Sequence, residues 1–225
     1  MESNRIKEIK SKRYIQSLIE EGENEHQDFK FQISDARKIA RSVSAFANNA
    51  GGHLLVGVKD NGRVTGVSSD EEIYMIEQAA TMYCLPAQQV KCNVYRVEGK
   101  AVLKVDIAPA AEPPVMAQDN DGSWTAYYRV ADENMIADPL QIALWESRRG
   151  SKPAALTFTE SERTLIDYIT RNGSVTLQRY MLMAHITQPT AQASVVSLCL
   201  MGTLSLRYQE GQCVIVLAQG KDGVD

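Results

Sequence analysis

The chain has 225 residues, of which 44% are hydrophobic, and a formal net charge of −4 at pH 7. This length accommodates two domains, and this hydrophobic content is enough to fill their cores. No apolar run approaches the length of about 18 residues that a membrane span requires, and the charged start is not followed by an apolar signal segment. We therefore expect a cytoplasmic protein that does not enter a membrane.

Cysteine and histidine are too dispersed to predict a metal centre. The chain has 4 Cys and 3 His, and none of the cysteines forms a Cys-x-x-Cys pair. We therefore expect buried, reduced thiols and neither a zinc site nor a disulfide framework.

The first half of the chain predicts helices and strands in alternation. An amphipathic helix over 4–21 and a strand over 26–31 come first, and Ser34 or Asp35 can cap the next helix. A strand over 54–58 precedes the hairpin turn at Asn61-Gly62. The further elements expected are a helix from Ser69 to about Leu85, strands over 90–97, 101–108 and 124–130, and a helix opened by Asp138-Pro139. These elements predict an α+β first domain, a mixed sheet with packed helices, over residues 1–148.

The second half predicts a smaller domain behind a polar linker at 149–157. A capping box at Thr159 to Glu162 begins the first of three short helices. The expected elements are helices over 159–172, 175–184 and 190–201, followed by strands over 203–208 and 212–217. Three helices and a β-hairpin over 158–218 resemble a winged helix-turn-helix, in which the third helix enters the major groove. Residues 219–225 are expected to form a flexible tail.

Five separated motifs of the first domain occur in a characteristic order. They are Asp28-Phe29-Lys30, Ala45 to Asn48, Gly51-Gly52, Gly57-Val58 with Asp60 and Gly62, and Tyr127 to Val130. In this order they resemble the Schlafen and AlbA-like family of DNA-binding domains over about residues 20–138. Asp28 stands where the family usually has Glu, and Ala131-Asp132 replaces its usual Gly-Ser. The resemblance implies a domain that binds nucleic acid.

We therefore expect a DNA-binding transcriptional regulator, with RNA as an alternative partner, that forms a homodimer as winged-helix regulators commonly do. Because the net charge is negative, local cation clusters such as Arg37, Lys38 and Arg41 would have to meet the phosphates, although each cluster can also be a solvated helix face. The candidate nucleic-acid-binding residues lie at the ends of elements; they are Lys30, Asn48, Asn49, Gly51, Gly52, Arg129, Arg179, Gln192 and Ser197. Structural roles remain open for them, such as helix termination by the two asparagines and an ion pair for Arg129.

Two other functions remain open. In Schlafen nucleases, which the first domain resembles, three carboxylates hold Mg²⁺ or Mn²⁺ for RNA cleavage, and the resemblance places them at Glu23, Asp28 and Asp60. Turn chemistry alone explains Asp60 before Asn61-Gly62, so the trio also has a structural interpretation. Alternatively the chain is a non-enzymatic scaffold, because residues 151–225 carry six Lys and Arg against six Asp and Glu.

Outside the nuclease alternative we expect no cofactor. ATP is not expected, because the chain has no Gly-x-x-x-x-Gly-Lys-Ser/Thr loop.

Overall fold

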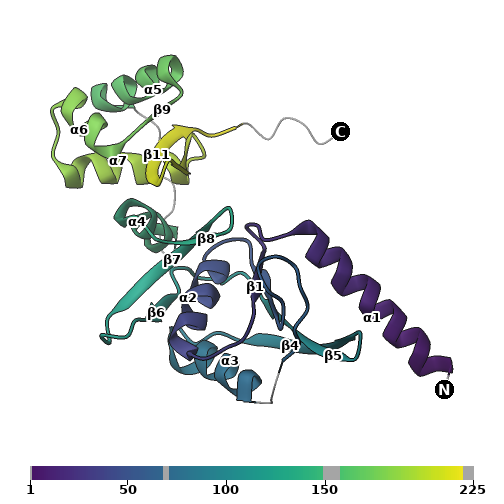
Figure 1. Cartoon of the computed structure of the whole chain (residues 1–225). Coiled ribbons are helices and arrows are strands. Elements are labelled where there is room, and N and C mark those ends of the chain that lie inside the picture. The colour runs from purple at the N-terminus through teal and green to yellow at the C-terminus, as the bar shows by residue number, and fades with distance from the viewer. Residues whose placement is uncertain (1, 68–70, 149–157, 220–225) are drawn as a thin grey trace. The chain divides into compact units, whose positions relative to one another are not determined.

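The computed structural model describes residues 2–67, 71–148 and 158–219 (Figure 1). The chain divides into two compact units, Met1–Ala137 and Asp138–Asp225, and its architecture is α+β, as predicted. The predicted linker, 149–157, and residues 220–225 of the predicted tail lie outside the described residues. Within the described ranges no helix is long and apolar enough to cross a membrane.

A four-stranded sheet of order β1-β2-β5-β4 lies at the centre of the first unit. Strands β1 (Gln27–Lys30) and β2 (Gly52–Val56) are parallel, whereas β5 (Lys100–Ile107) is antiparallel to β2 and to β4 (Val90–Val97). Glu98 and Gly99 both have positive φ and join β4 to β5 as a two-residue hairpin. The parallel pair places the carboxyl end of β1 beside that of β2.

A second sheet of order β3-β6-β7-β8 completes the first unit. It comprises β3 (Cys84–Leu85), β6 (Met116–Gln118), β7 (Trp124–Val130) and β8 (Glu133–Ile136), all antiparallel. The strand expected over 124–130 is therefore β7, the longest strand of this sheet.

Helices cover both faces of the central sheet. On one face, Ile15 and Leu18 of α1 (Glu2–Glu21) join a core with Phe29 and Leu55. On the other face, α2 (Ala36–Ala47) packs against this sheet, against the second sheet and against α3 (Glu71–Met82). The Asp35 side chain caps α2 as expected, by accepting a hydrogen bond from the backbone nitrogen of the second following residue at 2.9 Å. Helix α2 therefore holds both sheets of the unit together.

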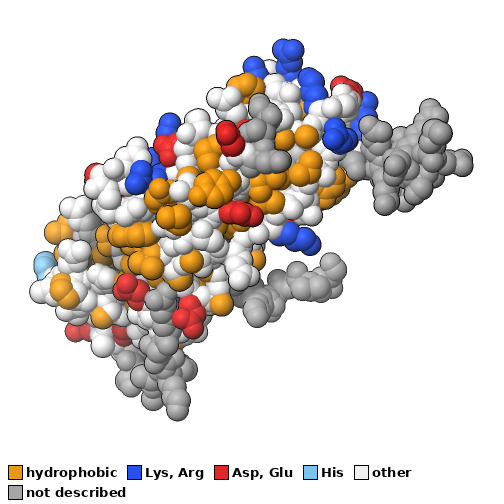
Figure 2. Space-filling model, turned by 90° about the horizontal axis from the view of Figure 1, so that it is seen from below, with side chains coloured by type: hydrophobic (Ala, Val, Ile, Leu, Met, Phe, Trp, Pro, Cys, Tyr) orange, Lys and Arg blue, Asp and Glu red, His pale blue; other side chains and the backbone are white. Residues whose placement is uncertain are grey.

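The outward face of α3 carries two large exposed apolar side chains beside Glu71, Glu77 and Thr81. Tyr74 is 65% exposed and Met82 is 61% exposed. Figure 2 views the molecule from below, where α3 lies in Figure 1, and shows hydrophobic side chains on that surface.

The second unit contains four helices and a small sheet in its described part. Its elements are α4 (Pro139–Arg148), α5 (Glu160–Asn172), β9 (Ser174–Val175), α6 (Leu177–Ala184), α7 (Gln188–Leu200), β10 (Leu204–Gln209) and β11 (Gln212–Leu217). The sheet order is β10-β11-β9, and the capping box at Thr159 and Glu162 opens α5 as expected. Strand β9 was not predicted, since two residues are too few to give a periodic pattern. Leu140 and Leu144 pack α4 into this core, so α4 groups with the second unit.

Candidate nucleic-acid interface

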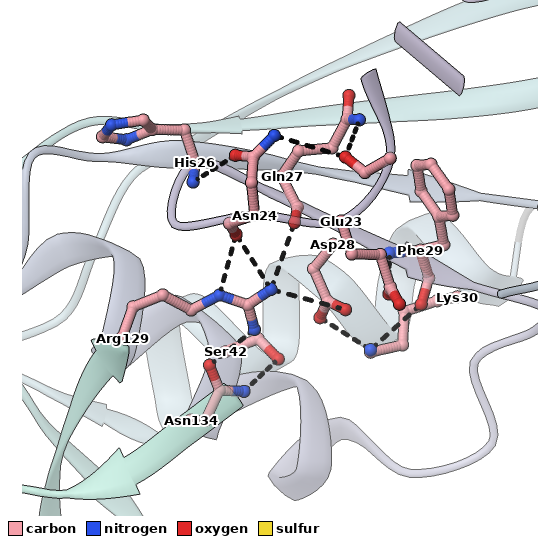
Figure 3. Close-up of polar contacts among 11 residues, drawn as sticks. Glu23, Asn24, His26, Gln27, Asp28, Phe29, Lys30, Ser42, Arg129 and Asn134 are labelled. Carbon is pink, nitrogen blue, oxygen red and sulfur yellow. Dashed lines mark hydrogen bonds and ion pairs between the residues drawn. The ribbon is translucent and has the colours of Figure 1, made fainter. Parts of the chain in front are cut away.

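Arg129, on β7, lies at the centre of a buried polar cluster and is 1% exposed (Figure 3). Its Nε and one terminal nitrogen each donate to the carbonyl oxygen of Asn24 at 3.2 Å, and the same terminal nitrogen donates to the carbonyl oxygen of Gln27 at 3.1 Å. The other terminal nitrogen donates to Oδ1 of Asn134 at 3.0 Å. The Phe46 ring lies 5.0 Å from the guanidinium carbon. The chain itself therefore supplies the partners of this predicted phosphate contact.

Asn48 and Asn49, at the end of α2, bind the backbone of the second sheet and of the segment before it. The Asn48 amide donates to the carbonyl oxygens of Val115 at 2.9 Å and Tyr127 at 2.8 Å, and its Oδ1 accepts from the Val115 nitrogen at 2.6 Å. The Asn49 side chain both donates to and accepts from the backbone of Arg129, at 2.8 and 3.1 Å. The two amides thus connect α2 to β7.

Gly51 and Gly52 lie where neighbouring groups leave no room for a side chain. A Cβ on Gly52 would lie 2.4 Å from a Phe46 ring carbon and 2.7 Å from the carbonyl oxygen of His26. Gly51 has φ of +79°, and a Cβ there would lie 2.8 Å from the carbonyl oxygen of Ile107. Close packing therefore accounts for glycine at both positions.

Glu23, Asp28 and Lys30 form a charged group at β1 (Figure 3). Oε1 of Glu23 accepts from the backbone nitrogen of Phe29 at 2.9 Å. Oδ2 of Asp28 lies 2.6 Å from the Lys30 ammonium, which also donates to the Phe29 carbonyl oxygen at 3.0 Å. Burial, and then the hydrogen bond with Asp28, raise the pKa of Glu23 above its ordinary value. The two carboxyl groups therefore compete to carry a negative charge, and Lys30 neutralises Asp28.

Asp60 lies apart from this group, exposed in the hairpin that closes between Val58 and Val64. Among the residues that the structure describes, no three His, Cys, Asp or Glu side chains are close enough to hold one metal ion. The structure thus brings Glu23 and Asp28 together without Asp60. With Asp28 paired to Lys30 and the pKa of Glu23 raised, this arrangement does not fit a divalent metal.

The outward cations of the first unit gather on α2. Arg37 stacks its guanidinium 4.7 Å from the centre of the Tyr83 ring, and neither Arg37 nor the exposed Lys38 forms an ion pair within the described part of the chain. One turn further, Arg41 pairs with Asp119 at 2.8 Å. Arg37 and Lys38 therefore present cationic groups that no described carboxylate neutralises.

The Lys59 ammonium lies over the exposed ring of Phe31, directly after β1. Phe31 is 46% exposed, and the ammonium of Lys59 lies 5.0 Å from the centre of its ring. Arg63, in the same hairpin as Lys59, is exposed and likewise has no ion-pair partner among the residues described. Phe31 and Lys59 thus combine a stacking surface with a cation.

The candidate residues of the second unit lie on two of its helices. Arg179 is exposed on α6, while Gln192 and Ser197 are partly buried on α7, which carries no charged residue. The second unit thus offers polar groups on α7 and a cation on the preceding helix.

Sequence reasoning did not select Arg37, Lys38 or Lys59 as site residues. The cluster on α2 was visible in the sequence, but charge alone does not reveal which cations lack a carboxylate partner. No sequence pattern indicates Lys59, because its contact with Phe31 depends on the pairing of β1 with β2.

Comparison with known proteins identifies the first unit. Residues 23–138 match the Schlafen, AlbA_2 family, and no curated protein matches the chain. The crystal structure of the DIP2311 protein from Corynebacterium diphtheriae is 24% identical over 70% of this chain, with a TM-score of 0.42, and the chain spans 32% of that protein. The N-terminal domain of a protein from Nitrosomonas europaea, named as related to the ATP-dependent DNA helicase RecG, is 20% identical over 67% of this chain and 95% of that domain, with a TM-score of 0.40.

Proposed function

Because this chain belongs to the Schlafen, AlbA_2 family, we propose that it binds nucleic acid, chiefly DNA, and acts as a transcriptional regulator. The observation that supports this most is the group of unneutralised cations, Arg37 and Lys38 on α2 and Lys59 beside Phe31. Cations of this kind release counterions from the phosphate backbone, so they can attract a polyanion although the whole chain is acidic.

The first unit supplies phosphate contacts in this proposal. Arg37 is held by stacking on Tyr83 with its Nε buried, so its terminal nitrogens would donate to a phosphate. Lys30, at the end of β1, is paired with Asp28 at 2.6 Å and therefore contributes less to this surface than the unpaired cations. Arg129, Asn48 and Asn49 support this surface from within, since they fix β7, α2 and the turn before β1 in place.

The second unit acts as a winged helix in this proposal. Its order of helices followed by the β10–β11 hairpin supports that assignment, with α7 as the recognition helix. Gln192 and Ser197 would contact bases or sugars, and Arg179 would contact phosphate. A homodimer would present two such units to paired half-sites.

The salt dependence of DNA binding tests the proposal. A labelled duplex is titrated with the full chain at several salt concentrations, and the logarithm of the affinity is plotted against that of the salt concentration. Arg37→Gln and Lys38→Ala should each reduce the slope by about 1, because each removes one phosphate contact. Lys12→Ala is the matched control, since the Lys12 ammonium is already paired with Glu98 at 2.8 Å.

Two results would contradict the proposal. The first is wild-type protein that retains neither duplex nor single strands in dilute buffer. The second is a slope that Arg37→Gln and Lys38→Ala change no more than Lys12→Ala does.

One observation favours a second candidate, a metal-dependent ribonuclease of the Schlafen type: Glu23 and Asp28 share a hydrogen bond. The described residues contain no group of three carboxylates that could hold a metal ion, which opposes it. If the chain is such a nuclease, it should cleave RNA when Mg²⁺ or Mn²⁺ is added and not when a chelator is present. Glu23→Gln, Asp28→Asn and Asp60→Asn should then each abolish cleavage. Intact RNA after incubation with wild-type protein and either metal would exclude it.

A protein without nucleic-acid retention and without cleavage would fit the third function, a scaffold whose second unit binds another protein.

A further inference from the structure

An exposed aromatic ring lies among cations at the carboxyl end of β1. Phe31, the residue directly after this strand, is 46% exposed. A single exposed apolar residue is ordinary on a protein surface and by itself indicates no ligand. Phe31 differs in its surroundings, because the Lys59 ammonium lies 5.0 Å from the centre of its ring.

The hairpin that carries Lys59 places a second cation opposite it. The backbone nitrogen of Lys59 donates to the carbonyl oxygen of Arg63 at 3.0 Å, so the two residues face each other across the turn. Both side chains are exposed, and neither forms an ion pair within the described part of the chain. Like charges at facing positions destabilise a hairpin, and the one acid between them is Asp60. A bound anion would relieve this repulsion.

The fold holds this hairpin at its base and near its tip. Val58 and Val64, at the base, pack into the core that α1 shares with the central sheet. Gly62, near the tip, lies so close to α1 that an added Cβ would be 2.8 Å from Cγ2 of Ile19. The two cations are therefore presented from fixed backbone, which lowers the entropy cost of binding a ligand.

The ring and the cations together select the ligand. An aromatic face stacks on planar rings and unpaired cations attract phosphate, so the combination fits a nucleotide whose base is accessible. In a duplex the neighbouring base pairs cover both faces of a base, whereas a base of a single strand can leave the stack. Lys59 can move away from the ring, since an exposed cation–π contact is weak and the lysine side chain is flexible. Its ammonium is then available to the phosphate of the stacked nucleotide.

We propose that Phe31, Lys59 and Arg63 form a binding site for single-stranded nucleic acid, in which one unpaired base stacks on Phe31 and the two cations contact its flanking phosphates. This proposal rests on the proposed function and names the form of nucleic acid that this site takes. Arg37 and Lys38 on α2 contribute phosphate contacts to any strand, whereas the ring of Phe31 adds a preference for unpaired bases. The site selects no particular sequence, because every base has a face that can stack.

Anisotropy titrations of the full chain test the proposal, with a labelled oligothymidine strand of about 12 nucleotides and a duplex of the same length. Phe31→Leu keeps an apolar side chain and removes the ring, so it should weaken binding of the strand about tenfold and change binding of the duplex less than about twofold. Phe31→Trp keeps a ring and should retain the affinity for the strand. Tyr74→Leu is the matched control, since it removes a 65% exposed ring on which no described cation stacks.

The salt dependence of strand binding tests the role of Lys59. Lys59→Ala should reduce the slope of the logarithm of the affinity against that of the salt concentration by about 0.7, as for one lost phosphate contact on a single strand. Lys12→Ala should leave this slope unchanged, because Glu98 already neutralises the Lys12 ammonium.

A measurement on wild-type protein guards against misfolding of the variants. An abasic strand of the same length keeps the phosphates and offers no base to stack, so wild-type protein should bind it at least about tenfold more weakly. Phe31→Leu should then bind the abasic strand as tightly as wild-type protein does, because its ring has no partner left to lose.

The outcomes separate this site from the proposed function. If wild-type protein binds nucleic acid but Phe31→Leu binds the strand as tightly as Tyr74→Leu does, the stacking site is wrong and the proposed function stands. Equal weakening of strand and duplex in Phe31→Leu would assign the ring to a wedge between base pairs, and it would also overturn the proposal. Wild-type protein that retains neither strand nor duplex would overturn the proposed function together with this site.

Discussion

Replacement of Arg129 by methionine should destabilise the first unit by about 3–5 kcal/mol. The side chain is 1% exposed, and its guanidinium supplies the donors for the carbonyl oxygens of Asn24 and Gln27 and for Oδ1 of Asn134. Methionine has a similar volume but no donor, so three acceptors lose a partner at about 1–3 kcal/mol each. Water that enters the site can hydrogen-bond some of these acceptors and so reduces the lost free energy. The remaining loss falls in the range found when one member of a buried charged network is removed.

Urea unfolding followed by tryptophan fluorescence measures this loss. Trp124 lies in the first unit and Trp145 in the second, so a Trp145→Phe background makes the signal specific for the first unit. Arg129→Lys should lose nearly as much stability, since a single ammonium cannot reach all three acceptors. Arg96→Met, at an exposed position, is the control.

A loss below about 1 kcal/mol for Arg129→Met, similar to that of the Arg96→Met control, would refute this reasoning. It would mean that the buried network contributes little to holding β7 against β1, and Arg129 would again be a candidate ligand contact.

Three further changes should alter stability in predictable directions. Burial, and then the charge of Lys104, lower the pKa of His53 from 6.5 to about 4. The contribution of neutral His53 to folding stability is therefore complete above pH 6.5 and is lost as the pH falls to 4. In His53→Gln the urea midpoint of unfolding should change less with pH over that interval. Gly52→Ala should cost at least about 1–3 kcal/mol in the unfolding of the first unit, because the added Cβ would lie 2.4 Å from a Phe46 ring carbon. Thr159→Ala should cost about 1 kcal/mol in the unfolding of the second unit, seen by calorimetry, since it removes the capping box of α5.

Much of the fold could be predicted from the sequence, because many of its helix caps and turns depend on residues close together in the chain. The Asp35 cap, the Glu98-Gly99 hairpin and the capping box at Thr159 each depend on residues within three positions of one another. The boundary between the units was less readable. The polar stretch at 149–157 suggested a linker after α4, whereas Leu140 and Leu144 place α4 with the second unit through contacts with distant residues.

For the candidate site, the sequence predicted which residue types take part but not how their side chains are arranged. Asn48 and Arg129 have the chemistry of ligand-binding residues, and they were selected for that reason. Their partners lie far away in sequence: Arg129 binds the carbonyl oxygen of a residue 105 positions before it, and Asn48 binds one 79 positions after it. Sequence spacing does not predict such pairs, so it could not show that both side chains face inward.

By itself, the sequence determined which segments form helices and strands and which family the first unit resembles, because turn, cap and periodicity signals act between near neighbours. Only the tertiary structure decided which charges are neutralised. The packing of β7 against the turn before β1 surrounds Arg129 with acceptors, the pairing of β1 with β2 brings Lys59 to Phe31, and Arg37 remains without a described carboxylate. A side chain is available to a ligand only if the fold has not already given it a partner, and that depends on contacts between residues far apart in the chain.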